Sequence, residues 1–146
     1  MEGLKTESHP GVLTPGIIII PVYNEEQNVR GVLEEIRGAG ITWDIVAIDD
    51  GSRDRSRELL ESLSVTVISH PVNLGYGAAI QTGLRYTVAM GYETVVLMDA
   101  DGQHVPSEIA NLLRGLEDGA DIVIGSRLLG PGAEYRIPLL RRIGIS

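Results

Sequence analysis

Short runs of apolar residues alternate along the chain with segments in which apolar residues recur at helical spacing. The runs are continuously apolar, which is typical of strands buried on both faces of a parallel sheet. They lie at Ile17–Val22, Asp44–Asp49, Val65–Ile68, Thr94–Met98 and Ile122–Ile124. Strands separated by helices favour an α/β fold: an open, mostly parallel, Rossmann-like sheet with helices on both faces.

Four segments between or after these runs carry apolar residues on one helical face. The first face ends at two glycines, Gly38 and Gly40, and Ser52 or Asp54 is available to cap the second helix. The four predicted faces are Val29, Val32, Leu33 and Ile36; Leu59, Leu60 and Leu63; Ile80, Leu84 and Val88; and Ile109, Leu112, Leu113 and Leu116. Pro106 lies near the first turn of the last helix, where proline is favoured.

Acidic residues follow three of the predicted strands. Asp99 and Asp101 come directly after an apolar run, Asp49 closes another, and Glu25 follows the first. In extended backbone, residues i and i+2 point the same way, so Asp99 and Asp101 would converge on one divalent cation, and their hard oxygen ligands suit Mg²⁺ or Mn²⁺. Because open α/β sheets bind ligands at the carboxyl ends of their strands, these acids predict a site there. The alternative for the Asp99–Gly102 segment is an ordinary turn after a strand.

Composition excludes several classes of function. With 146 residues, the chain is long enough for one domain with a real core. A net charge of −8 argues against nucleic-acid binding, and the lack of cysteine excludes disulfides, thiolate catalysis and cysteine-based metal sites. No run approaches the ~20 apolar residues of a membrane-spanning helix, and the N-terminus does not resemble a signal peptide. We therefore expect a cytoplasmic protein.

The two ends of the chain lack the regular pattern. Residues 1–15 predict a flexible tail, and residues 16–146 a single ligand-binding domain. Near the C-terminus, Arg136, Arg141 and Arg142 alternate with leucine and isoleucine, a mixture that suits peripheral contact with an anionic membrane surface. This segment ends within what looks like an amphipathic helix, so we expect the domain to be cut short at its C-terminus.

Five motifs occur in order along the patterned part of the chain. They are Pro21-Val22-Tyr23-Asn24-Glu25, Ile48-Asp49-Asp50-Gly51-Ser52, Asn73-Leu74-Gly75-Tyr76-Gly77, Asp99-Ala100-Asp101-Gly102-Gln103-His104 and Gly125-Ser126-Arg127. Together they resemble the family 2 glycosyltransferases with the GT-A fold, and within them the dolichyl-phosphate mannose synthases and polyprenyl-phosphate glycosyltransferases. The resemblance covers residues 17–127. It implies a nucleotide-sugar-binding GT-A domain whose acceptor-binding part lies beyond this chain.

The resemblance also implies roles for individual residues. The residues that would contact the nucleoside are Pro21, Tyr23, Glu25, Ala47 and Asp49. Asp99, Ala100 and Asp101 would hold the diphosphate through the metal, and Gln103 would join Asp99 and Asp101 as a metal ligand. Arg127 would meet phosphate charge directly, because a guanidinium pairs with phosphate in a bidentate fork. Glycine in the Asn73–Gly77 loop would permit close packing near the sugar.

The implied activity is metal-dependent, inverting transfer of a sugar from a UDP- or GDP-linked donor to an acceptor. A polyprenyl or dolichyl phosphate is favoured, because it is already anionic, whereas a saccharide hydroxyl would need a general base. Two alternatives belong to other classes: a non-catalytic nucleotide-sugar-binding module, and a phosphatase of the haloacid-dehalogenase type with Asp99 as nucleophile. The phosphatase would have threonine or valine in place of Gln103 and a lysine after Asp101, and the chain has neither.

Overall fold

The computed structural model describes residues 16–102 and 108–125. Their elements, in chain order, are β1 (Ile17–Val22), α1 (Val29–Gly38), β2 (Asp44–Asp49), α2 (Ser56–Ser62), β3 (Thr66–Ser69), α3 (Tyr76–Met90), β4 (Val95–Leu97) and α4 (Ile109–Glu117). The chain divides into two compact units, Met1–Pro106 and Ser107–Ser146. The predicted tail, residues 1–15, and the basic segment with Arg136, Arg141 and Arg142 lie outside the described residues. Within residues 16–102 and 108–125, no helix is long and apolar enough to cross a membrane.

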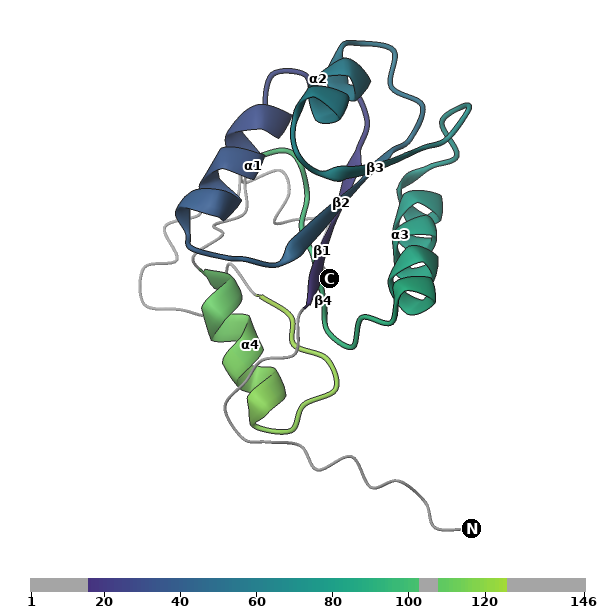
Figure 1. Cartoon of the computed structure of the whole chain (residues 1–146). Coiled ribbons are helices and arrows are strands. Elements are labelled where there is room, and N and C mark those ends of the chain that lie inside the picture. The colour runs from purple at the N-terminus through teal and green to yellow at the C-terminus, as the bar shows by residue number, and fades with distance from the viewer. Residues whose placement is uncertain (1–15, 103–107, 126–146) are drawn as a thin grey trace, which may run out of the picture. The chain divides into compact units, whose positions relative to one another are not determined.

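The first unit is built on a parallel sheet of strand order β3-β2-β1-β4 (Figure 1). The register sets Val22 of β1 beside Asp49 of β2, and Asp49 beside Ser69 of β3. The carboxyl ends of these strands therefore share one edge. Helices α1 and α2 lie on one side of the sheet and α3 on the other (Figure 1). This arrangement confirms the predicted α/β fold.

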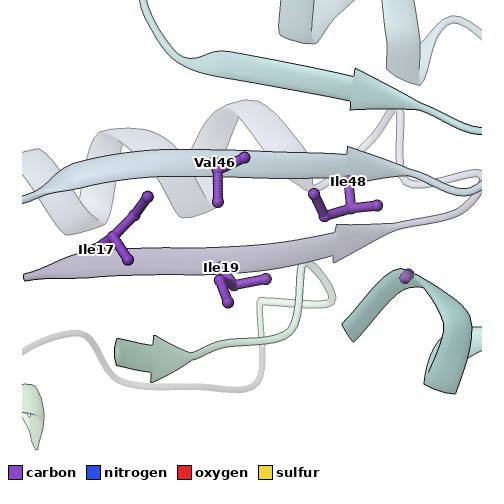
Figure 2. Packing of buried hydrophobic residues seen from close by; sticks show 5 residues of the cluster. Ile17, Ile19, Val46 and Ile48 are labelled. Atoms are coloured by element: carbon purple, nitrogen blue, oxygen red, sulfur yellow. The ribbon is translucent and has the colours of Figure 1, made fainter. Parts of the chain in front are cut away.

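Strand β1 is the centre of the core. All six of its residues are buried, because β1 has a strand on either side and helices over both faces. On the face toward α3, Ile17 and Ile19 lie beside Val46 and Ile48 of β2 (Figure 2). The continuous apolar runs of β1 and β2 thus follow from burial on both faces, and both strands have the bounds predicted from the sequence.

Helix α3 lies where it was predicted but buries a different face. The sequence predicted Ile80, Leu84 and Val88 as the core face, whereas the buried residues are Ala79, Gly83 and Thr87. Leu84 is 41% and Val88 80% exposed. A side chain added at Gly83 would place its Cβ 2.5 Å from Cγ2 of Ile19, so the helix packs too close to β1 for a larger residue. Small residues face the sheet for this reason, and the prediction of the larger residues was wrong.

The predicted fifth strand, Ile122–Ile124, is not a strand in the described structure. Ile122 and Ile124 are 79% and 83% exposed, while the side chain of Val123 lies against Gly115 of the same unit. Alternating exposure is compatible with extended backbone, but a strand also needs a neighbour that pairs with its N–H and C=O groups. The apolar run alone did not supply that neighbour, so the sheet within the described residues has four strands.

Candidate functional site

A pocket of about 380 Å³ opens at the carboxyl end of the sheet, in the first unit. Its walls come from the loops after β1, β2, β3 and β4 and from the first turns of α3. The lining residues are Pro21, Val22, Tyr23, Glu25, Asp50, Asn73, Gly75, Tyr76, Ala79, Asp99, Ala100 and Asp101. Parallel strands bring these distant segments together at one edge, which is where open α/β sheets bind ligands.

Six of the predicted site residues line this pocket, two do not, and two lie outside the described residues. Those that line it are Pro21, Tyr23, Glu25, Asp99, Ala100 and Asp101. Ala47 is fully buried within β2, and Asp49, at the end of β2, is only 2% exposed. The Oδ1 atom of Asp49 accepts a hydrogen bond from the N–H of Ser52 at 3.1 Å. Gln103 and Arg127 lie outside the described residues.

Of the two acids after β4, Asp101 lies in a bend formed by residues 100–102, and Asp99 lies between the end of β4 and that bend. Strand β4 ends at Leu97, although the N–H of Met98 still donates to the carbonyl of Ile19 at 3.1 Å. Gly102, with φ at 71°, takes the left-handed conformation that favours glycine. The chain therefore bends directly after Asp99, which is compatible with the turn alternative. The pocket nonetheless receives both Asp99 and Asp101.

Tyr76, in the first turn of α3, reaches across the pocket to Asp99. Its hydroxyl donates a hydrogen bond to Asp99 Oδ1 at 2.8 Å. Burial, followed by the hydrogen bond to Asp99 and the negative charges of Asp99 and Asp101, raises the pKa of Tyr76 to about 12. The tyrosine therefore stays protonated at neutral pH and orients one oxygen of Asp99. The sequence marked Tyr76 only as part of a glycine-bearing loop.

The loops after β1 and β2 are joined by reciprocal hydrogen bonds. The N–H of Asn24 donates to Ser52 Oγ at 3.0 Å, and that of Arg53 donates to Asn24 Oδ1 at 2.8 Å. The N–H of Glu25 donates to Ser56 Oγ at 2.7 Å. Asn24 has a φ of 56°, which lets both its backbone and its side chain face the second loop. These bonds fix the chain between Tyr23 and Glu25 at the pocket wall.

The expected capping role of Ser52 is not observed, because its hydroxyl is occupied by Asn24. Asp54 is the residue that serves the start of α2: its Oδ1 accepts from the N–H of Ser56 at 2.9 Å and from its hydroxyl at 2.6 Å. Burial opposes a charge on Asp54, but the hydrogen bonds from Ser56 and from the N–H of Glu26 outweigh burial and lower its pKa.

Asp50 is a buried carboxylate for which the sequence predicted no role beyond its place in the Ile48–Ser52 motif. Its Oδ1 lies 2.7 Å from His70 Nδ1 and accepts from the N–H of Leu74 at 2.9 Å. Its Oδ2 accepts from the N–H of Gly75 at 2.8 Å. Burial alone would raise the pKa of Asp50, but these hydrogen bonds and the nearby His70 outweigh burial and lower it. No spacing rule in the sequence connects Asp50 with His70.

A solved glycosyltransferase has a similar fold. A solved mannosyltransferase from Pyrobaculum calidifontis, in complex with GDP-Man and Mn²⁺, superposes with a TM-score of 0.63 at 23% identity, over 75% of this chain and 34% of that one. An open parallel α/β sheet of the GT-A glycosyltransferase type is therefore the class of fold. The family model of glycosyl transferase family 2 matches residues 17–145, and the chain belongs to that family.

Two curated relatives are similar over most of this chain. The polyprenol monophosphomannose synthase of Mycolicibacterium smegmatis is 36% identical over 136 residues, which are 89% of this chain and 51% of that protein. The UDP-N-acetylglucosamine--dolichyl-phosphate N-acetylglucosaminyltransferase of Methanococcus voltae is 31% identical over 145 residues, and the match covers 87% of this chain and 57% of that protein. The chain thus spans about half the length of these curated relatives.

Proposed function

We propose that the chain is the donor-binding part of a metal-dependent, inverting glycosyltransferase that moves a sugar from a nucleoside-diphosphate sugar to a polyprenyl or dolichyl phosphate. The observation that carries the proposal is the pocket itself. Asp99 and Asp101 enter it from one strand end, and the exposed ring of Tyr23 from the next. Family membership and the two relatives, whose names state lipid-phosphate acceptors, support it.

The described residues suit Mg²⁺ or Mn²⁺. No group of three or more His, Cys, Asp or Glu that could hold a metal ion occurs in residues 16–102 and 108–125. Two carboxylates are nevertheless sufficient for these ions, because Mg²⁺ in particular keeps several waters and takes its remaining ligands from substrate phosphates. Asp99 and Asp101 would hold the ion, with Gln103 as a further ligand. When bound, the ion supplies positive charge where negative charge grows on the departing diphosphate.

The other pocket residues would bind the nucleoside. Tyr23 is 40% exposed and offers an aromatic face to a base, and Glu25 offers carboxylate oxygens to base N–H groups or ribose hydroxyls. Glu25 Oε2 already accepts from Asn28 Nδ2 at 2.8 Å, which holds the carboxylate in place. Pro21 shapes the same wall. Asp49, which lies beside Val22 in the register, would act from the adjacent strand β2, whereas Ala47 is fully buried in that strand and has no surface to offer the nucleoside.

A lipid phosphate as acceptor needs no general base at the site. A phosphate oxygen is already ionised, so it attacks the sugar carbon directly, inverts it and releases the nucleoside diphosphate without a proton acceptor. Arg127 would pair with phosphate at this stage. Transfer to a lipid also requires the enzyme to bind at a membrane surface, and we propose the cytoplasmic face of the membrane.

Binding of UDP and GDP to the 146-residue chain, measured by calorimetry with Mn²⁺ or with excess EDTA, tests the donor site. We expect one nucleotide to bind with Mn²⁺ and to lose at least about tenfold in affinity in EDTA, since charge-assisted contacts each contribute about 1.5–3 kcal/mol. Asp99→Asn and Asp101→Asn should cause a similar loss. Glu93→Gln, an exposed acid before β4, is the matched control and should bind like the parent.

Equal affinity with Mn²⁺ and in EDTA would exclude the metal bridge. Transfer itself is tested by incubating the chain with nucleotide sugars and polyprenyl phosphate in detergent and looking for the glycolipid. Binding without transfer is what a donor-binding part alone would give, so only formation of the glycolipid separates a transferase from a nucleotide-sugar-binding module.

A further inference from the structure

Two buried polar residues, Asp50 and His70, lie side by side just after the carboxyl ends of β2 and β3. Asp50 follows β2 and His70 follows β3, and the sheet ladder continues to both: the N–H of Asp50 donates to the carbonyl of Val22, and that of His70 to the carbonyl of Asp49, each at 2.8 Å. The side chains of His70 and Asp50 are only 9% and 4% exposed. Their pairing is therefore set by the register of the sheet.

Both nitrogens of the His70 ring have partners. Nδ1 donates to Asp50 Oδ1 at 2.7 Å, because an ionised carboxylate can only accept. Nε2 lies 2.8 Å from Oγ1 of Thr82 in α3, and that hydroxyl can donate to the neutral ring or accept from the charged one. The chain of contacts thus runs from the end of β2, through the end of β3, into the second turn of α3.

The same carboxylate holds one wall of the pocket. The N–H groups of Leu74 and Gly75, which lead directly into α3, both donate to Asp50. Asn73, Gly75 and Tyr76 line the pocket around this point. Two N–H groups of the Asn73–Gly77 loop therefore donate to a protein carboxylate and not to a phosphate.

Gly51, which directly follows Asp50, allows the backbone to lie close to that of Val72 and Asn73 in the pocket wall. A Cβ added at Gly51 would lie 2.5 Å from the carbonyl carbon of Val72 and 2.7 Å from the nitrogen of Asn73. Backbone thus packs directly on backbone here. Gly51 allows the Val72–Asn73 backbone to approach, and Asp50 holds the following residues, Leu74 and Gly75, by hydrogen bonds. The position of this pocket wall therefore depends on both residues.

We propose that Asp50, His70 and Thr82 form a positioning relay for donor binding, which holds the Asn73–Tyr76 wall so that Tyr76 meets Asp99 across the pocket. The inference rests on the proposed function, since its consequence is a weaker nucleotide complex when the relay is broken. His70 does not touch the donor; it acts through Asp50 and the loop. Its loss should loosen Leu74 and Gly75 first and weaken the donor complex as a result.

Conservative variants separate a positioning role from simple loss of stability. His70→Asn places an amide N–H near the position of Nδ1 and keeps the donor to Asp50, whereas His70→Gln reaches toward Thr82 instead, and His70→Ala does neither. Thr82→Val and Thr87→Val make a matched pair in α3, because both remove a hydroxyl but only that of Thr82 contacts His70.

The experiment measures, for each 146-residue variant, the amide exchange rates of Leu74 and Gly75 by NMR, and the affinity for UDP and GDP with Mn²⁺. In His70→Ala we expect both amides to exchange about tenfold faster and affinity to fall about tenfold, the effect of losing a buried charge-assisted hydrogen bond. His70→Asn should recover most of both, and His70→Gln little. Thr82→Val should show a smaller change in the same direction, and Thr87→Val none at these amides.

Unchanged exchange of Leu74 and Gly75 in a folded His70→Ala protein would overturn the relay, as would equal values for His70→Asn and His70→Gln. If the parent binds neither UDP nor GDP, the proposed function and the donor-binding consequence fall together, while the exchange rates still decide whether the relay holds the wall. Faster exchange with unchanged nucleotide affinity would overturn the link between wall and donor alone.

Discussion

Replacing Gly51 with alanine tests how closely the pocket wall is packed. Gly51 and Gly40 both have left-handed backbone, with φ at +69° and +74°, but only Gly51 has neighbours within 4 Å. Alanine at either position meets the conformational cost of that region, about 1–2 kcal/mol. At Gly51 the new Cβ would also lie 2.5–2.9 Å from backbone atoms of Val72 and Asn73. Those atoms cannot rotate away as a side chain could, and overpacking of this kind costs about 1–3 kcal/mol more.

We therefore expect Gly40→Ala to lower the free energy of unfolding by about 1–2 kcal/mol and Gly51→Ala by about 2–5 kcal/mol. Urea unfolding followed by circular dichroism measures both. Gly51→Ala should also weaken nucleotide binding, because the Val72–Asn73 backbone must shift at the pocket, whereas Gly40→Ala should bind normally. Equal losses of stability in the two variants would refute the close contact and with it the argument that Gly51 sets the wall.

Three further predictions follow from contacts in the first unit. As pH falls through 3.8 and below, Asp50 takes up a proton in the unfolded chain before it does in the folded one, so the stability that ionised Asp50 contributes is present above that pH and lost below it. Asp50→Asn should therefore be less stable than the parent at pH 7, and its free energy of unfolding, measured with urea, should fall less as the pH is lowered. Gly83→Ala should destabilise by about 1–2 kcal/mol through its contact with Ile19, whereas Gly31→Ala, on an open helix position, should stabilise by up to about 1 kcal/mol in the same assay. Asp49→Ala should weaken nucleotide affinity in calorimetry with the circular dichroism spectrum unchanged; parental affinity would count against its role at the ribose or base.

The sheet was predictable because its signal is local. The aliphatic run of β1 and the run that ends in Asp49 are each buried on both faces, and the hydrophobic pattern alone records that. Helix α3 shows the limit of such reasoning. Its spacing predicted a helix, but the choice of face depended on how closely the helix approaches Ile19, which the sequence of α3 does not contain.

The site divides in the same way. The acids Asp99 and Asp101 were predicted because they directly follow a strand, and both reach the pocket. The pairing of Asp50 with His70 and the reach of Tyr76 to Asp99 were not predictable, because each joins residues at least twenty positions apart through the register of the sheet. Interactions of that kind become visible only when the strands are in place.

The central position of β1 sets the order in which the pocket can be completed during synthesis. Residue Ile17 pairs with Asp44 on one side but with Val95 on the other, so the second partner leaves the ribosome long after the first. A nascent chain that ends before β4 already holds β1, β2 and β3 but exposes the hydrogen-bonding edge of Ile17 and Ile19, an apolar strand edge of the kind that recruits other chains. The acids that follow β4 arrive together with the strand that covers this edge. Covering of this edge and completion of the pocket therefore depend on the same segment of the nascent chain, β4 and the acids that follow it.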